Sequence, residues 1–330
     1  MGLLASSHEP QSLSLIKEAE QRIGEKIRRE LGPAVCEALQ QSDVVEILLN
    51  ADGRLWVERL GQPMTPIGRM NPSQAESLMA TVAATLHTTI TRENPILECE
   101  LPLDGSRFEA LIPPVVAAPV FTIRRRASQV FRLSDYVAAG IMTQEHHQAL
   151  SQAVNSRQNI LVVGGTGSGK TTLANALIAE IVDLAPTDRL AIIEDTAEIQ
   201  CAAENAVLLR ATDTVDMLRL LKATMRLRPD RILVGEVRGP EALSLLKAWN
   251  TGHPGGVATI HANSARAGLT RLEQLIAEAT QAPMQTLIAE AVNLVVYMAR
   301  TPTGRRVEQI LSVEAFEGPE YRTRTLEAHL

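Results

Sequence analysis

The first third of the chain contains two stretches with the spacing of amphipathic helices. Apolar residues recur three and four positions apart over 11–40, which predicts one long helix. Its apolar stripe consists of Leu15, Ile16, Ala19, Ile23, Ile27 and Leu31. A second helical pattern covers 72–90, with Pro72 near its start, where the missing N–H of proline costs no helical hydrogen bond.

Short apolar runs between and after these helices predict strands. Residues 46–49 and 54–57 flank the sequence Asn50-Ala51-Asp52-Gly53, whose Asp-Gly pair favours a hairpin turn. Three further strands are predicted near 95–101, 107–112 and 120–125. We therefore expect a small α+β domain over 1–128, followed by a linker at 129–134.

The pattern changes from residue 160 onward, where continuous apolar runs are separated by helical segments. Such runs are typical of parallel strands that are buried on both faces of a sheet. The predicted strands are 160–163, 190–193, 232–234 and 256–260. Residues 135–330 are therefore predicted to form an α/β domain.

Composition narrows the classes of function. A chain of 330 residues is long enough for two domains, and its 45% hydrophobic content supports a sizeable core. The net charge is −6, from 32 basic and 38 acidic residues, and only 3% of the residues are aromatic. Proteins that bind nucleic acid through a basic surface or stacked aromatic rings usually carry more of both. Direct nucleic-acid binding is therefore not expected.

Several features predict a cytoplasmic protein. Cys36, Cys99 and Cys201 have neither metal-ligand spacing nor the even number of a disulfide framework, which favours a reducing compartment. The longest uncharged apolar run, 110–123, is shorter than the ~18 residues of a membrane span and is broken by prolines. The N-terminus lacks a signal-peptide pattern, and the match of residues 1–6 to a myristoylation pattern is too short to carry weight.

One motif predicts nucleotide chemistry. Residues 164–171, Gly-Gly-Thr-Gly-Ser-Gly-Lys-Thr, match the phosphate-binding loop and lie between an apolar strand and a helix. Glycines let backbone N–H groups turn toward phosphate oxygens, and the helix N-terminus adds the positive end of its dipole. Lys170 would contact the β- and γ-phosphates, and Thr171 would ligate Mg²⁺. The predicted nucleotide-binding residues are Gly164, Gly165, Thr166, Gly167, Ser168, Gly169, Lys170, Thr171 and Thr172.

The bound base is predicted to be adenine. Guanine-specific GTPases usually add an Asn-Lys-x-Asp element, and none of the five lysines in this chain has an aspartate two positions later. ATP is therefore favoured as the cofactor.

Two of the predicted strands end in carboxylates. Residues 190–193 lead to Glu194-Asp195, with Glu198 three residues further on, and 232–234 lead to Gly235-Glu236. Because the carboxyl ends of parallel strands face the ligand crevice, these groups could hold Mg²⁺ through water or activate the attacking water. An acidic residue after a strand is also a common helix N-cap, but two such ends after a phosphate loop favour the catalytic interpretation.

Two of the seven histidines, His253 and His261, bracket a glycine-rich turn and a strand. A histidine at a strand end can hydrogen-bond a γ-phosphate and respond to its loss. A metal pair is the alternative, but the sequence near them holds no cysteine and no third histidine. A purely structural role remains open for either residue.

Taken in order, these motifs resemble those of the secretion-ATPase superfamily. The phosphate loop is similar to its Walker A motif, 193–198 to its acidic box, 233–238 to an atypical Walker B motif and 251–263 to its histidine box. Residues 42–50 and the pair Arg107 and Arg124 look like the type IV secretion branch. The similarity to conjugative-transfer ATPases of the TrbB type extends over about residues 20–315.

This resemblance implies a PAS-like N-terminal domain in front of a RecA-like P-loop ATPase domain, in a homohexamer that uses ATP and Mg²⁺. The ring would lie on the cytoplasmic face of a bacterial inner membrane and contact inner-membrane components of the secretion apparatus. By motif position, Thr171 and Glu236 would ligate Mg²⁺, directly or through water. The residues implied to act on the γ-phosphate or its attacking water are Glu194, Glu236, His253, His261, Arg107 and Arg124.

Alternative functions share the same core. A pilus-retraction or type II secretion-like motor, a DNA translocase and a non-hydrolysing nucleotide-gated scaffold all remain open at this point. Many type II secretion and pilus-extension motors carry a four-cysteine zinc element, for which this chain has too few cysteines. The alternative for Arg107 and Arg124 is a solvated basic face or a peripheral contact with anionic lipid.

Overall fold

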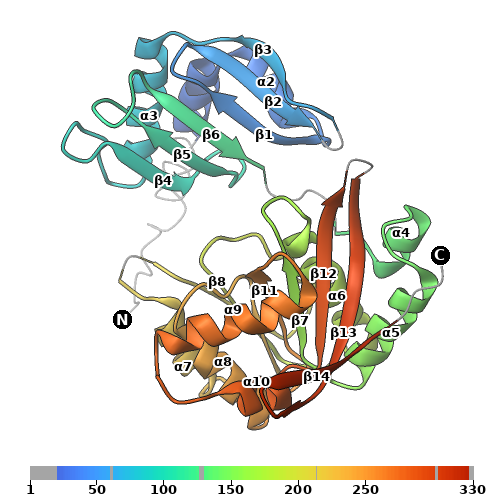
Figure 1. The fold of residues 1–330 in the computed structure, drawn as a ribbon. Helices are drawn as coiled ribbons and strands as arrows, with labels where there is room; N and C mark the ends of the chain where they lie inside the picture. The colour runs from blue at the N-terminus through green and yellow to red at the C-terminus, as the bar shows by residue number, and fades with distance from the viewer. Residues whose placement is uncertain (1–20, 60–61, 126–129, 213, 302–303, 327–330) are drawn as a thin grey trace, which may run out of the picture. The chain divides into compact units, whose positions relative to one another are not determined.

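The computed structural model describes residues 21–59, 62–125, 130–212, 214–301 and 304–326. The chain divides into two compact units, Met1–Ser128 and Gln129–Leu330 (Figure 1). Within the described ranges, every helix is too short or too polar to cross a bilayer. Residues 11–20 of the predicted first helix, and residue 129 of the predicted linker, lie outside these ranges.

The first unit is built on a six-stranded antiparallel sheet. Alternate strand residues, such as Ile47 and Leu49, point into its core. They pack against a helix at 21–31, α2 (Pro33–Gln40) and α3 (Pro72–Thr85). The predicted hairpin and the three predicted strands that follow are confirmed. The strand order is β3 (Thr65–Arg69), β2 (Arg54–Arg59), β1 (Val44–Leu49), β6 (Val120–Arg124), β5 (Arg107–Leu111) and β4 (Ile96–Glu100).

The predicted single helix over 11–40 is wrong. Its described part consists of two helices, 21–31 and α2, which are separated at Gly32. Gly32 has φ 80° and ψ 167°, a conformation that only glycine adopts readily. Pro33 then starts α2 and lacks the N–H that would continue the first helix.

Two other elements of the first unit differ from the prediction. Helix α3 ends at Thr85 rather than at residue 90, and His87 follows with a left-handed φ of 56°. The β-branched run 88–91 that comes next favours helix less than the residues before it. Strand β3 is absent from the prediction because it contains Pro66 and Gly68, which are tolerated at the edge of a sheet.

The second unit is built on an eight-stranded sheet. Its order is β14 (Glu320–Thr325), β13 (Gly304–Glu317), β12 (Leu294–Thr301), β7 (Ile160–Gly164), β11 (Val257–His261), β10 (Arg231–Val234), β8 (Leu190–Glu194) and β9 (Ala206–Arg210). The six strands from β12 to β9 are parallel, and β13 and β14 are antiparallel. The four predicted strands are therefore confirmed as parallel neighbours.

Helices cover both faces of this sheet (Figure 1). Leu161 and Val163 of β7 belong to a core shared with α7 (Met217–Thr224), α8 (Glu241–Asn250), α9 (Ala265–Ala277) and α10 (Gln285–Ala291). Ile160 and Val162 belong to the opposite core, with α4 (Leu133–Ala138), α5 (Gln144–Asn155) and α6 (Lys170–Leu184). Leu133 and Ser134, the last residues of the predicted linker, form the first turn of α4.

The sequence pattern does not predict β9 or the strands β12–β14. Strands β13 and β14 alternate apolar residues with charged ones such as Arg306 and Glu308, so they lack a continuous apolar run. Strand β12 is apolar and extends the parallel sheet on the side of β7 away from β11. This position matters because it places β12 beside the phosphate loop.

The break at Gly32 generates a stability prediction. We expect Gly32→Ala to lower the free energy of unfolding by about 1–3 kcal/mol, because a Cβ strains the backbone at φ 80°. Gly24→Ala is the matched control. Gly24 lies inside helix 21–31, and an added Cβ would meet its nearest neighbour at 3.4 Å, so alanine should stabilise by up to about 1 kcal/mol. Urea unfolding followed by far-UV circular dichroism measures both changes. Equal effects of the two substitutions would contradict the assigned break.

Candidate functional site

The phosphate-loop motif connects β7 to α6 at the carboxyl ends of the parallel strands. Gly167 and Gly169 have φ values of 70° and 96°, in the left-handed region that favours glycine. At Gly164, an added Cβ would lie 2.4 Å from Ser168 Oγ and 2.5 Å from the carbonyl oxygen of Met298. The loop therefore needs glycine both for its curvature and for its close approach to β12. Helix α6 begins at Lys170, which places the loop at a helix N-terminus.

Lys170 and His261 lie together beside this loop. The Lys170 ammonium donates a hydrogen bond to the carbonyl of Gly165 at 3.0 Å and lies 3.5 Å from each ring nitrogen of His261. His261 ends β11 in register with Gly164, which ends β7. The parallel register thus brings the predicted phosphate-binding lysine and one predicted γ-phosphate sensor to the same point.

The acidic box is held on the first turns of α6. The Thr171 hydroxyl donates to a carboxylate oxygen of Glu198 at 3.2 Å. One turn later, the Asn175 side chain donates to the backbone carbonyl of Glu198 at 3.1 Å and accepts from the N–H of Gln200 at 3.0 Å. Residues 198–200 are therefore fixed to the helix that follows the phosphate loop.

Glu194 is buried at the end of β8 and stabilises the turn that follows it. Its Oε2 accepts hydrogen bonds from the backbone N–H groups of Glu198 at 2.9 Å and Ile199 at 3.0 Å. Burial raises the pKa of Glu194 above its usual value, although these two N–H groups and Arg210 oppose the shift. The carboxylate therefore acts, in this geometry, as an acceptor for the backbone of the acidic box.

Glu236 lies in a different electrostatic environment. One carboxylate oxygen accepts from Arg238 at 2.9 Å, and the other lies 3.1 Å from Nε2 of His261. Burial alone would raise the pKa of Glu236, but the hydrogen bond and charge of Arg238, with the charges of His261 and Lys170, hold it below its usual value. Glu236 is therefore ionised and directed toward the Lys170–His261 pair.

Arg238 connects the two acidic strand ends. It forms an ion pair with Asp195 in the acidic box as well as with Glu236. The sequence motifs alone do not single out Arg238. A usable signal exists, because side chains two positions apart at a strand end point to the same side, so Arg238 is expected beside Glu236.

His253 is not brought to the phosphate loop within the second unit. It lies before β11, at the amino ends of the parallel strands, whereas the loop lies at their carboxyl ends. Its Nδ1 is 2.8 Å from the carbonyl oxygen of Pro229. Its assignment as a γ-phosphate sensor stays a prediction. The contact with Pro229 joins two loops of the second unit and is a structural one.

Arg107 and Arg124 are brought together in the first unit. They are cross-strand partners on β5 and β6. The same row of the sheet continues to Glu100 on one side and to Glu46 and Glu58 on the other. Like charges directly opposite one another in a sheet repel, and the carboxylates on both sides of this row offset the charge of the two arginines.

A family model described as "Type II/IV secretion system protein" matches residues 30–320 of the chain. The chain belongs to this family. The membership confirms the resemblance to secretion ATPases that the motifs indicate.

This secretion-family chain has close relatives among conjugal transfer proteins. It is 59% identical to the probable conjugal transfer protein TrbB of Sinorhizobium fredii over 300 residues, which cover 91% of the chain and 92% of the relative. It is 57% identical to the conjugal transfer protein TrbB of Rhizobium radiobacter over 302 residues, covering 92% and 94%.

Among solved structures, the fold is similar to that of the ATPase DotB of Yersinia pseudotuberculosis, with a TM-score of 0.62 and 17% identity. The match covers 84% of this secretion-family chain and 77% of that structure. The predicted fold class, a RecA-like α/β domain preceded by a smaller α+β domain, is confirmed.

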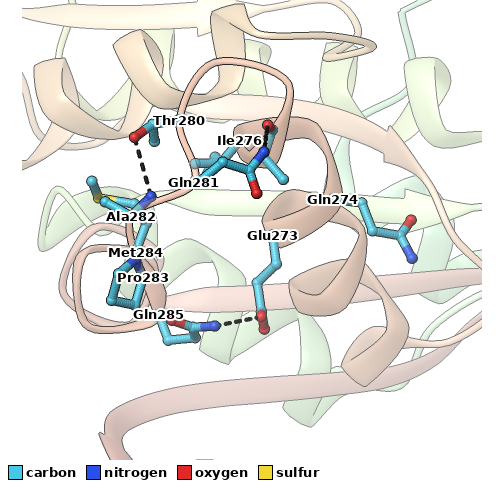
Figure 2. A pocket seen from close by; sticks show the side chains of 10 residues that line it. Glu273, Gln274, Ile276, Thr280, Gln281, Ala282, Pro283, Met284 and Gln285 are labelled. Atoms are coloured by element: carbon cyan, nitrogen blue, oxygen red, sulfur yellow. Dashed lines mark hydrogen bonds between the residues drawn. The ribbon is translucent and has the colours of Figure 1, made fainter.

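A separate pocket of about 410 Å³ lies between the end of α9 and the start of α10 (Figure 2). Its one lining carboxylate, Glu273, accepts a hydrogen bond from Gln285 at 2.8 Å. The pocket lacks both a phosphate loop and a basic side chain among its lining residues. It therefore does not compete with the site at the strand ends for nucleotide.

The pKa of Glu194 generates a pH-dependent stability prediction for this family member. A carboxyl whose pKa is raised by folding holds its proton more tightly in the folded state. That stabilisation is present below the ordinary pKa of 4.5 and is lost as the pH rises through the folded-state value. Wild type should therefore lose stability as the pH rises from 4.5 toward neutrality, whereas Glu194→Gln should not, because glutamine cannot ionise. The free energy of unfolding of the variant should thus increase relative to that of wild type over this range.

Urea midpoints of both proteins across this pH range measure the difference. Glu204→Gln, at an exposed residue of the same segment, controls for the loss of a surface charge. A stability difference between Glu194→Gln and wild type that stays constant with pH would contradict the assigned environment.

Proposed function

We propose that this chain is an ATP hydrolase that powers a bacterial type IV secretion or conjugal transfer apparatus. Its family membership and its TrbB relatives support the type of apparatus. The observation that carries the proposal is the convergence of Lys170, Glu236 and His261 on one side of the phosphate loop. These three groups surround the place where a γ-phosphate would lie.

Each of these residues has a defined task in hydrolysis. The Lys170 ammonium, which donates to the Gly165 carbonyl in this structure, contacts the β- and γ-phosphates when nucleotide is bound. Its charge there stabilises the transition state. His261 donates a hydrogen bond to the γ-phosphate and, through its contact with Glu236, responds when that phosphate is lost. Glu236, kept ionised by Arg238, orients the attacking water and accepts its proton.

We assign water activation to Glu236 rather than to Glu194. One oxygen of Glu194 already accepts two backbone hydrogen bonds, so this carboxyl is used to hold residues 198 and 199. Its task is to position the acidic box against Thr171, through Glu198. Glu194 thus supports the site without touching the reacting atoms.

Mg²⁺ is the metal that these residues suit. Oxygen ligands are what Mg²⁺ prefers, and the Thr171 hydroxyl lies within hydrogen-bond distance of Glu198. Mg²⁺ usually takes its other ligands from substrate phosphates and water. Thr171 would hold it, with Glu198 or Glu236 acting through water. When bound, it would neutralise charge on the β- and γ-phosphates.

We propose that Arg107 and Arg124 serve the same reaction from the first unit. Two guanidinium groups side by side on β5 and β6 form a site for a polyanion, since each can contact two phosphate oxygens. Their assigned ligand is the γ-phosphate of a bound nucleotide, in their own subunit or in a neighbouring one.

The assembly is proposed to be a homohexamer on the cytoplasmic face of the inner membrane. A ring that contacts inner-membrane components would couple ATP turnover to assembly of the apparatus or to substrate transfer. The acidic net charge and the scarcity of aromatic residues support a protein partner rather than direct nucleic-acid binding.

Glu236→Gln tests the proposed function. The amide keeps the size of the side chain but cannot accept a proton, so we expect turnover to fall at least ~100-fold while ATP binding persists. The measurements are steady-state ATPase activity, ATP affinity and transfer frequency from a donor strain that carries only the variant. Wild-type turnover in Glu236→Gln would contradict its role. Wild-type transfer by an ATPase-dead variant would contradict the motor.

A second prediction concerns the arginine pair. Arg107→Ala and Arg124→Ala should each depress turnover strongly but change ADP affinity little, because ADP lacks the γ-phosphate. Arg54→Ala is the control, since Arg54 pairs with Asp52 in the β1–β2 turn. ATPase assays and ADP titrations separate these effects. Normal turnover with lost binding to anionic vesicles would instead identify a membrane patch.

Mixing Lys170→Ala subunits with Arg107→Ala subunits locates the contact. Recovered activity in the mixture means that the arginine acts on a neighbouring subunit's nucleotide. Activity that is not recovered means that it acts within its own subunit.

A further inference from the structure

Two arginines of the second unit lie beside the phosphate loop and have no place in the mechanism above. Strand β12 pairs with β7 so that Met298 lies opposite Gly164, the last residue of β7. Strand β12 then continues past the end of β7, and its hairpin partner β13 returns alongside (Figure 1). Arg300 and Arg305 are cross-strand partners in this projecting part, so their side chains share one face of the hairpin.

Both side chains meet the glycines of the loop. Arg305 donates a hydrogen bond from Nε to the carbonyl oxygen of Gly167 at 3.0 Å. A Cβ added to Gly169 would lie 3.2 Å from Cδ of Arg305, and one added to Gly167 would lie 3.7 Å from Nη1 of Arg300. The outer wall of the phosphate loop therefore consists of two guanidinium-bearing side chains.

The position of this wall indicates which part of a nucleotide it meets. In the sheet, β7 lies between β11, which carries His261, and β12. Lys170, His261 and Glu236 thus flank the loop on the β11 side, and Arg300 and Arg305 flank it on the β12 side. If the γ-phosphate lies on the β11 side, the opposite wall faces the α- and β-phosphates, which ATP and ADP share.

The chemistry of the wall suits these phosphates. A guanidinium group has five N–H donors, and the bond to Gly167 uses only the Nε donor of Arg305, so its two terminal nitrogens are not needed for that bond. Arg305 is half-buried and Arg300 is exposed, so a ligand can reach both. The next residue, Arg306, lies on the other face of the strand and pairs with Glu308 at 3.2 Å.

We propose that Arg305 and Arg300 are nucleotide-binding residues that contact the α- and β-phosphates, with Arg305 also positioning the loop through Gly167. The proposal rests on nucleotide binding at the phosphate loop, the proposed function of this site. The two pairs of arginines then have different ligands. Arg107 and Arg124 recognise the γ-phosphate, and Arg300 and Arg305 recognise the α- and β-phosphates, which remain in ADP after hydrolysis.

The test measures dissociation constants for ADP and for a non-hydrolysable ATP analogue in the full chain. Arg305→Gln can still donate to Gly167 but has no charge, and Arg305→Lys keeps the charge. We expect Arg305→Gln and Arg300→Ala to weaken both nucleotides by about tenfold or more and by similar factors, with a smaller loss for Arg305→Lys. The difference in dissociation constant between these variants and wild type should become smaller at about 1 M salt, because salt screens direct charge contacts. Arg306→Ala is the matched control and should bind as wild type does.

Three results would overturn the proposal. Wild-type affinity in Arg305→Gln would mean that the tether to Gly167 is the whole role of this residue. An equal loss of nucleotide affinity in Arg306→Ala would mean that the charge of the hairpin acts in a general way. A loss of affinity by the Arg305 and Arg300 variants for the ATP analogue alone would place the γ-phosphate on the β12 side. If the variants match a wild-type protein that binds both nucleotides, only this proposal fails. If wild type binds neither, the proposed function fails with it.

Discussion

The backbone hydrogen bonds that align β11, β7 and β12 determine which side chains surround the phosphate loop. Gly164 lies opposite His261 on one side and Met298 on the other. A slip of one residue in either pairing would turn the neighbouring side chains to the opposite face of the sheet. The absence of a Cβ at Gly164 permits this alignment, since a side chain there would collide with the Met298 carbonyl. Lys170, although it lies on a helix, finds its partners only because the strands are held in this register.

The same alignment separates two carboxylates into different tasks. Glu194 ends β8 and Glu236 follows the neighbouring strand β10. Burial prevails at Glu194, whereas at Glu236 burial is outweighed by the hydrogen bond and charge of Arg238 together with the charges of His261 and Lys170. Their pKa values therefore shift in opposite directions. Adjacent strand ends therefore carry one carboxylate paired with Arg238 and His261 and one carboxyl that supports the backbone of the acidic box.

The parts of this fold that depend on local sequence could be predicted. The phosphate loop is contiguous, and the strands β7, β8, β10 and β11 are continuous apolar runs, so each is visible without knowledge of the fold. The break at Gly32 has the local signature of Gly-Pro but lies inside a strong helical periodicity, which conceals it. Strands β13 and β14 have no such run, and β12, although apolar, matters because it pairs with β7, which is far away in sequence.

The candidate site was predictable to the extent that its residues lie at strand ends. Glu194, Glu236 and His261 follow from that rule, whereas His253 shares the motif but lies at the opposite end of its strand. Arg305 has no sequence signal, because its contact with Gly167 depends on the pairing of β12 with β7 and on the hairpin that follows.

That pairing also has a consequence for how the protein is made. The ribosome synthesises β7 and the phosphate loop well before β11, and β12 comes later still. Ile160 of β7 therefore pairs with residues made much later, Val257 of β11 and Leu294 of β12. Until both neighbours emerge, β7 is an apolar strand with two unpaired edges, which is a hazard for aggregation. The central strand of the second unit must therefore wait for the last third of the chain, and a truncated product would expose it.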